Sequence, residues 1–309
     1  MSTTLIKNIG SILRIEISIL KTLAYFDLFK YPITSSEIRS FIDLSIDENN
    51  LADSLNTLLL QKKIFLLDEF YSLQNDPSLA ERRKKGNKRA AELLSKAEKI
   101  ARLLYKFPYV RAVAISGSVS KNFADEQADI DYFIITKADR LWIARTLLHI
   151  YKKNPFLKNR NEYYCMNYFV DEADLVIEEK NIYTATEIYT IIPMACNGSI
   201  KTFFEANSWS HRYFPNLSFP PIKVQKNSPW YKKVTESIFN NKIGNWLENY
   251  FFWLTTKRWK KKEVEKRLNT KGELMGLKTG KHFSKPNPIF FHNTFMSKYE
   301  KRLNELIKN

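Results

Sequence analysis

The 309-residue sequence contains little cysteine, histidine and glycine. Cys165 and Cys196 stand alone without a CxxC spacing, and the four histidines are scattered along the chain. A structural zinc site takes about four clustered Cys or His ligands, and disulfide-stapled domains are rich in cysteine, so both are excluded. The eight glycines likewise exclude a collagen-like chain. We interpret the two cysteines as buried thiols in a reducing compartment.

Long apolar runs are also missing. No stretch reaches the roughly 18 uninterrupted apolar residues that a membrane span requires. The segment from Met1 to Leu20 is amphipathic, because Arg14 and Glu16 interrupt its apolar run, and no small-residue cleavage site follows it. This pattern predicts a helix and not a signal peptide. Together with the cysteine usage, it predicts a cytoplasmic protein.

Aromatic and basic residues are abundant. The 21 Phe, 16 Tyr and 6 Trp provide ample material for a packed core, which excludes a mostly disordered chain. The formal net charge is +16, and most of the excess lies in Pro221–Asn309, where 20 Lys and Arg face 7 Glu and no Asp. Such a surface attracts phosphate-rich partners, namely nucleotides, nucleic acid or anionic lipid.

The N-terminal segment shows helical spacing of apolar residues, followed by two short apolar runs. Thr34 or Ser35 can N-cap a short helix after Pro32. The predicted elements are, in order, helices at Ile12–Phe29, Ser36–Phe41 and Asp47–Lys62 and strands at Ile64–Leu67 and Phe70–Leu73.

This order of elements resembles a winged helix-turn-helix domain, which we expect over residues 1–78. A DNA-reading helix needs basic side chains toward phosphates and bases. The candidate helix instead carries Asp47, Glu48 and Asp53, and its first basic residue is Lys62. A scaffold or protein-docking role is therefore favoured over sequence-specific DNA reading.

Two predicted strands carry polar residues near one another. Val110–Ile115 is a buried strand by composition, Ser116–Ser118 ends it, and Ala128–Thr136 forms a second strand. Asp129 and Asp131 lie two residues apart, which places both carboxylates on one face of that strand. Two like charges this close cost free energy unless a cation lies between them. Mg²⁺ or Mn²⁺ prefers such oxygen ligands, completed by substrate phosphate oxygens.

The turn after the first strand has the composition of an anion site. Gly117 allows close approach of the backbone, and Ser118 adds a hydroxyl donor. The amides there begin a predicted helix, which suits a triphosphate. Lys121 lies one turn further, where its ammonium group can reach a phosphate.

This segment resembles the polymerase-β-like nucleotidyltransferase superfamily over about residues 95–200. The shared signature is a strand, Gly117-Ser118, ten intervening residues, and Asp129-Ile130-Asp131 on a second strand. Combined with the N-terminal winged helix, it resembles bacterial proteins that contain a nucleotidyltransferase domain. The resemblance implies an α+β protein with a nucleotidyltransferase α/β core and a mixed sheet at residues 79–215. A basic, mainly helical region follows at 216–309.

The resemblance also implies a mechanism with Mg²⁺ or Mn²⁺ held by both aspartates and a third carboxylate on an adjacent strand. An acceptor group attacks the α-phosphorus of an NTP in line, and pyrophosphate leaves. At the expected third position, in the strand Glu162–Val170, this sequence has Asn167. Asp171, Glu172 and Asp174 just beyond that strand are the candidates to replace the missing acid.

The C-terminal half predicts a helix over Ile182–Cys196 that breaks near Pro193, and further helices over Trp230–Arg267. The basic run Lys257–Lys262 has three readings, which are a solvated end of a helical bundle, a nucleic-acid contact and a membrane-surface contact. Lys278–Lys285 is predicted as a basic loop.

The sequence thus favours a metal-dependent nucleotidyltransferase that transfers a nucleoside monophosphate from an NTP to an unidentified acceptor. Asp129 and Asp131 are its predicted metal-binding and catalytic residues, and Gly117, Ser118, Lys121 and Asn167 its predicted nucleotide-binding residues. The alternative is a catalytically degenerate protein that binds a nucleotide, or binds nucleic acid through its basic C-terminal region.

Overall fold

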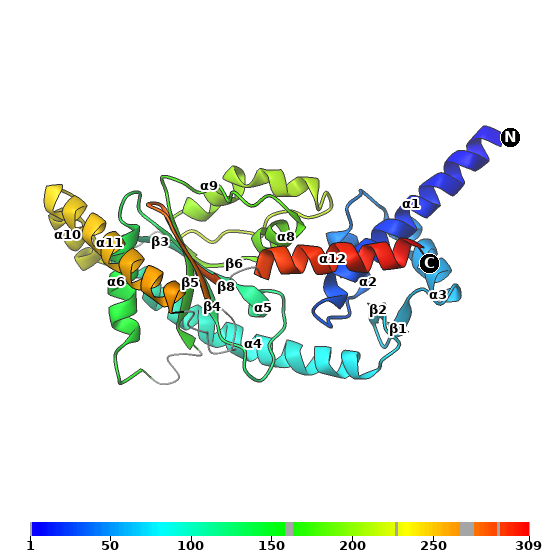
Figure 1. Cartoon of the computed structure of the whole chain (residues 1–309), viewed down its shortest axis with the longest axis horizontal. Coiled ribbons are helices and arrows are strands. Elements are labelled where there is room, and N and C mark those ends of the chain that lie inside the picture. Colours follow the sequence, from blue (N-terminus) through cyan, green and yellow to red (C-terminus); the bar gives the residue numbers. More distant parts are fainter. Residues whose placement is uncertain (1, 158–162, 226–227, 266–274, 289–290, 309) are drawn as a thin grey trace.

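The computed structural model describes residues 2–157, 163–225, 228–265, 275–288 and 291–308. The molecule is elongated, with N-terminal helices at one end and a six-stranded sheet further along (Figure 1). Helices α10 (Trp230–Ile238) and α11 (Lys242–Val264) lie at the opposite end. Among the described residues, no helix combines the length and the hydropathy that crossing a lipid bilayer requires.

The N-terminal unit contains three helices and a two-stranded antiparallel sheet in the predicted order. Its second helix begins as expected, because the Thr34 hydroxyl accepts from the Glu37 amide and the Glu37 carboxylate accepts from the Thr34 amide. The elements are α1 (Ser2–Asp27), α2 (Ser35–Phe41), α3 (Glu48–Leu60), β1 (Phe65–Leu67) and β2 (Phe70–Ser72).

Helix α4 (Ser78–Tyr105) joins the N-terminal unit to the central sheet. Near its start, Arg83 is 3% exposed, donates to the Pro32 carbonyl at 2.7 Å and pairs with Glu37 at 2.7 Å. Further along, Leu93, Ala97 and other apolar residues of α4 pack in the core beneath the sheet. One helix therefore fixes both parts of the molecule to each other.

The central sheet is mixed, as the sequence predicted. Its strands are β3 (Val110–Ser116), β4 (Asp131–Thr136), β5 (Cys165–Asp171), β6 (Ile192–Cys196), β7 (Met275–Thr279) and β8 (Phe283–Pro288). Their spatial order is β6-β3-β4-β5-β8-β7, in which β4 and β5 pair in parallel and the other neighbours pair antiparallel.

The two faces of the sheet have separate hydrophobic cores. Ile130, Tyr132 and Ile134 share a core with α4 and α6 (Leu141–Lys152). Phe133 and Ile135 point the other way, toward α8 (Ile182–Thr190) and α9 (Ser199–Ala206) (Figure 1). This alternation follows from the two-residue period of a strand.

Two predictions for the second half of the chain are wrong. The segment 182–196 is not one broken helix, because α8 ends at Thr190 and Ile192–Cys196 forms the edge strand β6. Proline is tolerated in that edge strand. The segment Lys278–Lys285 is not a loop, because β7 and β8 extend the central sheet there.

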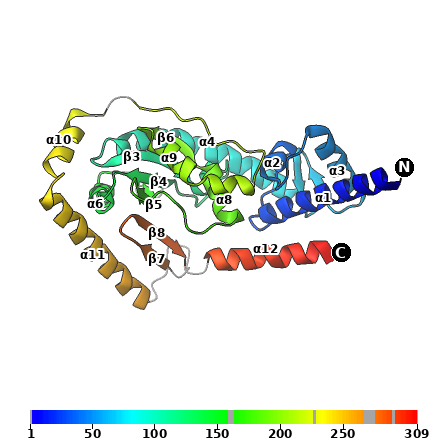
Figure 2. The same cartoon turned by 90° about the horizontal axis from the view of Figure 1, so that it is seen from above.

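The last helix, α12 (Phe291–Lys308), runs back along the N-terminal unit (Figure 2). The rings of Phe295 and Tyr25 lie 5.2 Å apart, and Arg302 pairs with Asp27 of α1 at 3.0 Å. Residues beyond 216 therefore pack on several parts of the fold, because α11 packs on α6, β8 pairs with β5, and α12 packs on α1.

Candidate active site

Gly117 and Asp131 meet at one corner of the sheet. Ser116, the last residue of β3, is the ladder partner of Asp131, the first residue of β4. Gly117 follows with φ +71°, a conformation that favours glycine, and begins the short helix α5 (Gly117–Ser120). A Cβ at this position would lie 2.3 Å from the Asp131 Oδ2 atom. The backbone can approach the carboxylate this closely because residue 117 has no side chain.

Asp129, Asp131 and Cys165 form a cluster of possible metal ligands at this corner. One ligand atom from each residue lies within 4.8 Å of the other two. The predicted joint placement of the two carboxylates is therefore seen in the structure, although β4 begins only at Asp131. Cys165 comes from β5, where it is the ladder partner of Asp131.

The donor chemistry of this cluster fits a hard divalent cation held mainly by the two aspartates. Carboxylate oxygens suit Mg²⁺ and Mn²⁺, whereas a thiol suits softer metals. Burial, together with the charges of Asp131 and Asp129, raises the pKa of the Cys165 thiol. Cys165 therefore stays protonated at neutral pH and adds no third negative charge to the corner.

The register of β5 is irregular at Asn167, the residue that the sequence places at the third-acid position. Tyr132 pairs with Met166 and Phe133 with Tyr168, so the ladder skips Asn167 at a bulge. The side chain of Asn167 lies outside the described part of the chain, and its predicted nucleotide contact stays a prediction.

The candidate replacement acids, Asp171 at the end of β5 and Glu172 and Asp174 after it, lie at the end of the strand away from Asp131. Asp171 pairs in register with Thr136, five residues along β4 from Asp131. Its buried carboxylate accepts from the Asp139 amide at 2.9 Å and lies 3.0 Å from His282 Nδ1. Asp171 therefore has a structural role. Glu172 and Asp174 follow at the same far end, so the proposed replacement by these three acids is wrong.

Lys121 lies at the corner, as predicted, but its charge is already paired. Its Nζ atom is 2.7 Å from Glu187 Oε1 and donates to the Gly117 carbonyl at 3.0 Å. Glu187 belongs to α8, and sequence reasoning missed it. The one feature of the sequence that could have indicated it is that Glu187 is the only charged residue of α8.

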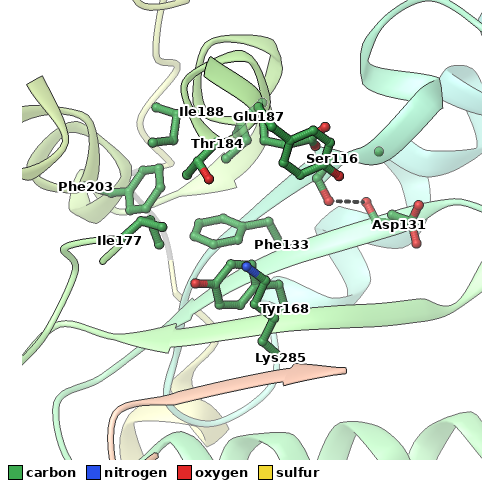
Figure 3. Close-up of a pocket in the computed structure, with 13 residues that line it drawn as sticks. Ser116, Asp131, Phe133, Tyr168, Ile177, Thr184, Glu187, Ile188, Phe203 and Lys285 are labelled. Atoms are coloured by element: carbon green, nitrogen blue, oxygen red, sulfur yellow. Dashed lines mark hydrogen bonds between the residues drawn. The ribbon is translucent and has the colours of Figure 1, made fainter. Parts of the chain in front are cut away.

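A cavity of about 150 Å³ opens beside Asp131 on the sheet face below α8 (Figure 3). Ser116, Gly117 and Asp131 line its end at the corner, and the opposite, inner wall is apolar. Lys285 of β8 also lines it, with Nζ 5.3 Å from the Tyr168 ring centroid, and burial lowers the pKa of this lysine. The inner wall consists of Phe133, Tyr168, Ile177, Ile188, Ile191 and Phe203.

A second cavity, of about 280 Å³, meets the first at Gly117, Tyr183 and Glu187. It lies between the Gly117 corner and the N-terminal unit, and it is also lined by Ser118 and Lys121. The N-terminal unit contributes aromatic rings to its wall, from Tyr25 and Phe26 of α1 and from Phe29 and Tyr31 between α1 and α2. The two cavities thus approach the same corner from different sides.

Comparison with known families supports this assignment of the core. Residues 94–195 match the family model of the nucleotidyltransferase domain. The match covers about a third of the chain and includes β3, the glycine corner, both aspartates, Cys165 and α8. Comparisons with curated proteins and with solved structures gave no significant match. The match supports the predicted nucleotidyltransferase superfamily, whereas the winged-helix class and a bacterial origin stay predictions.

Proposed function

We propose that the protein is a metal-dependent nucleotidyltransferase that transfers a nucleoside monophosphate from an NTP to an acceptor. The observation that carries the proposal is the corner itself, where the Asp129 and Asp131 carboxylates lie together and Asp131, beside Gly117, lines a cavity. The match of residues 94–195 to the nucleotidyltransferase domain supports it.

Each residue at the corner has a physical task in this proposal. Asp129 and Asp131 hold Mg²⁺ or Mn²⁺, which when bound neutralises charge that develops on the triphosphate. Gly117 lets phosphate oxygens approach the backbone, and the Ser118 hydroxyl donates a hydrogen bond to them. The ammonium group of Lys121, which is paired with Glu187, orients that carboxylate at the junction of the cavities.

The two cavities suit a reaction with two substrates. In-line displacement requires the acceptor and the leaving pyrophosphate on opposite sides of the α-phosphorus. The apolar inner wall beside Phe133 and Phe203 can hold a planar ring, while the second cavity offers a separate approach to the corner. The N-terminal unit, in our proposal a winged-helix module, serves as a wall of that second cavity and does not read DNA.

The second candidate function is nucleotide binding without transfer, as in a catalytically degenerate member of the superfamily. One observation favours it, namely that Cys165 occupies the place beside Asp131 where a third carboxylate would complete the metal site. Both candidates need the two aspartates for metal-dependent nucleotide binding. Formation of labelled product from an α-labelled NTP in a cell extract separates them, because the degenerate protein forms none.

The test of the site replaces Asp129→Asn and Asp131→Asn together. We expect the affinity for a non-hydrolysable NTP analogue with Mn²⁺, measured by calorimetry, to fall by more than about tenfold, since even indirect disturbance of metal ligands costs 10–100-fold. The control, Asp53→Asn with Asp174→Asn, neutralises two exposed carboxylates elsewhere and should leave binding unchanged. Unchanged affinity in the first variant would show that the corner does not hold the metal.

A further inference from the structure

Helix α11 presents an apolar stripe to solvent. Four large side chains, spaced three and four residues apart, lie on this outward face, which we call the aromatic stripe. Their exposed fractions are 62% for Ile243, 62% for Trp246, 41% for Tyr250 and 54% for Trp253. Exposure of single apolar residues is ordinary, but a contiguous row of aromatic side chains marks an interaction site.

The aromatic stripe is not needed to hold α11 in place. The opposite side of the helix packs on α6 through Leu247 and Phe251. Glu248 on that inner side accepts hydrogen bonds from the Trp142 and Ile143 amides at 2.7 and 2.9 Å, capping α6. Helix α11 therefore has two apolar faces, and the outward one has no role in the core.

The neighbouring helix α10 extends the apolar surface. Trp230 is 76% exposed and Ile238 is 58% exposed. Of the six tryptophans in the chain, the three that are mostly exposed, Trp230, Trp246 and Trp253, all belong to α10 and α11. Figure 2 shows that these helices form the end of the molecule farthest from the N-terminus, where a large flat partner can reach them.

Basic residues follow the aromatic stripe along α11. Lys257 lies over the Trp253 ring at 5.0 Å, and its neighbours in the next turns are exposed cations. We call this set the basic run, which consists of Lys257, Arg258, Lys260, Lys261 and Lys262. An outward face with aromatic and aliphatic side chains beside exposed cations is typical of helices that lie at an anionic lipid surface.

We propose that α10 and α11 dock the protein peripherally on an anionic lipid bilayer, with the aromatic stripe at the headgroup–acyl boundary and the basic run on the headgroups. A second copy of the chain fits this face less well, because two basic runs would repel each other. Single-stranded nucleic acid also fits less well, since base stacking needs free ring faces. The rings of Trp246 and Tyr250 already stack on each other, 5.5 Å apart and 8° from parallel.

The experiment measures binding of the full-length protein to vesicles of 70% phosphatidylcholine and 30% phosphatidylglycerol, with pure phosphatidylcholine vesicles for comparison. Co-sedimentation gives the partition coefficient. The emission of Trp230, Trp246 and Trp253 should shift to the blue on binding and be quenched by brominated lipid. We expect binding to the anionic vesicles and at least about tenfold weaker binding after Trp246→Ala with Trp253→Ala.

A second variant tests the contribution of positive charge by replacing Lys260→Gln, Lys261→Gln and Lys262→Gln. Each basic residue near an anionic surface contributes about a fivefold factor, so we expect binding to weaken by about a hundredfold. The matched control for the tryptophan variant is Phe156→Ala, which removes an 89% exposed aromatic ring outside the aromatic stripe and should not alter binding. Unchanged thermal melting of all variants shows that they are folded, as expected for exposed positions.

Several results would overturn the proposal. The proposal is refuted if the wild-type protein does not bind the anionic vesicles. It is also refuted if the tryptophan variant binds them as tightly as the wild type does. A labelled dT₂₀ oligonucleotide that binds through the same residues more tightly than vesicles assigns the face to nucleic acid. A wild-type dimer that the tryptophan variant converts to monomer in sedimentation velocity assigns it to self-association.

Discussion

Replacement of Gly117 by alanine tests the geometry of the corner most directly. The added Cβ would lie 2.3 Å from Asp131 Oδ2, whereas ordinary contacts begin at 3.4 Å, so the carboxylate must retreat by roughly 1 Å. A misplacement of about 1 Å in a catalytic site costs about 10²-fold in rate. Alanine at φ +71° also adds roughly 1–2 kcal/mol of backbone strain.

A matched control separates the strain from the displaced carboxylate. Gly198 also has a positive φ, of +111°, but a Cβ there meets no atom within 4 Å. Gly198→Ala should therefore lower the free energy of unfolding by a similar amount and leave the corner intact.

The assay pairs calorimetric titration of Mn²⁺ with an NTP analogue and urea unfolding of the metal-free protein. We expect Gly117→Ala to lose stability and at least about tenfold in Mn²⁺–nucleotide affinity. We expect Gly198→Ala to lose stability alone. If Gly117→Ala binds like wild type, the Asp131 carboxylate does not hold the metal at this corner. If both variants lose binding equally, backbone strain and not the carboxylate is the cause.

Two further predictions concern the titratable side chains of Cys165 and Lys232. Cys165→Asp adds a third carboxylate beside Asp131, so we expect calorimetry to show tighter binding of Mn²⁺. Without metal, repulsion between the carboxylates should lower the melting temperature of the variant. An unchanged Mn²⁺ affinity would contradict this prediction. Burial lowers the pKa of Lys232 to about 8. Between about pH 8 and 10.4 the unfolded chain therefore binds more protons than the folded chain, so the free energy of unfolding rises with pH in this range. Lys232→Met should flatten that rise, which urea unfolding from pH 7.5 to 9.5 measures.

The corner could be predicted from the sequence because the residues that form it lie close to one another along the chain. Gly117 directly follows β3 and Asp131 begins β4, the next strand along the chain, which pairs with β3. The pattern of polar residues next to buried strands marks where those strands begin and end. The N-terminal helices were predictable for the same reason, since the cap at Thr34 and the apolar spacing are properties of short segments.

The walls of the site could not be predicted because they depend on pairing across the chain. A bulge at Asn167 changes which residues of β5 face the site, and no short sequence pattern predicts this bulge. Lys285 reaches the first cavity because β8 pairs with β5, a long-range contact. Glu187 reaches the corner through its ion pair with Lys121, which only the folded chain brings within 2.7 Å.

Helix α11 shows a different limit of pattern reading. Both Leu247 with Phe251 and Trp246 with Tyr250 recur at helical spacing, so the sequence alone does not tell which of the two stripes faces the core. The structure assigns the first pair to α6 and leaves the second exposed. Because a helix held by one apolar face has no structural need of another, the exposed stripe and the adjoining basic run are best explained by a partner outside the fold.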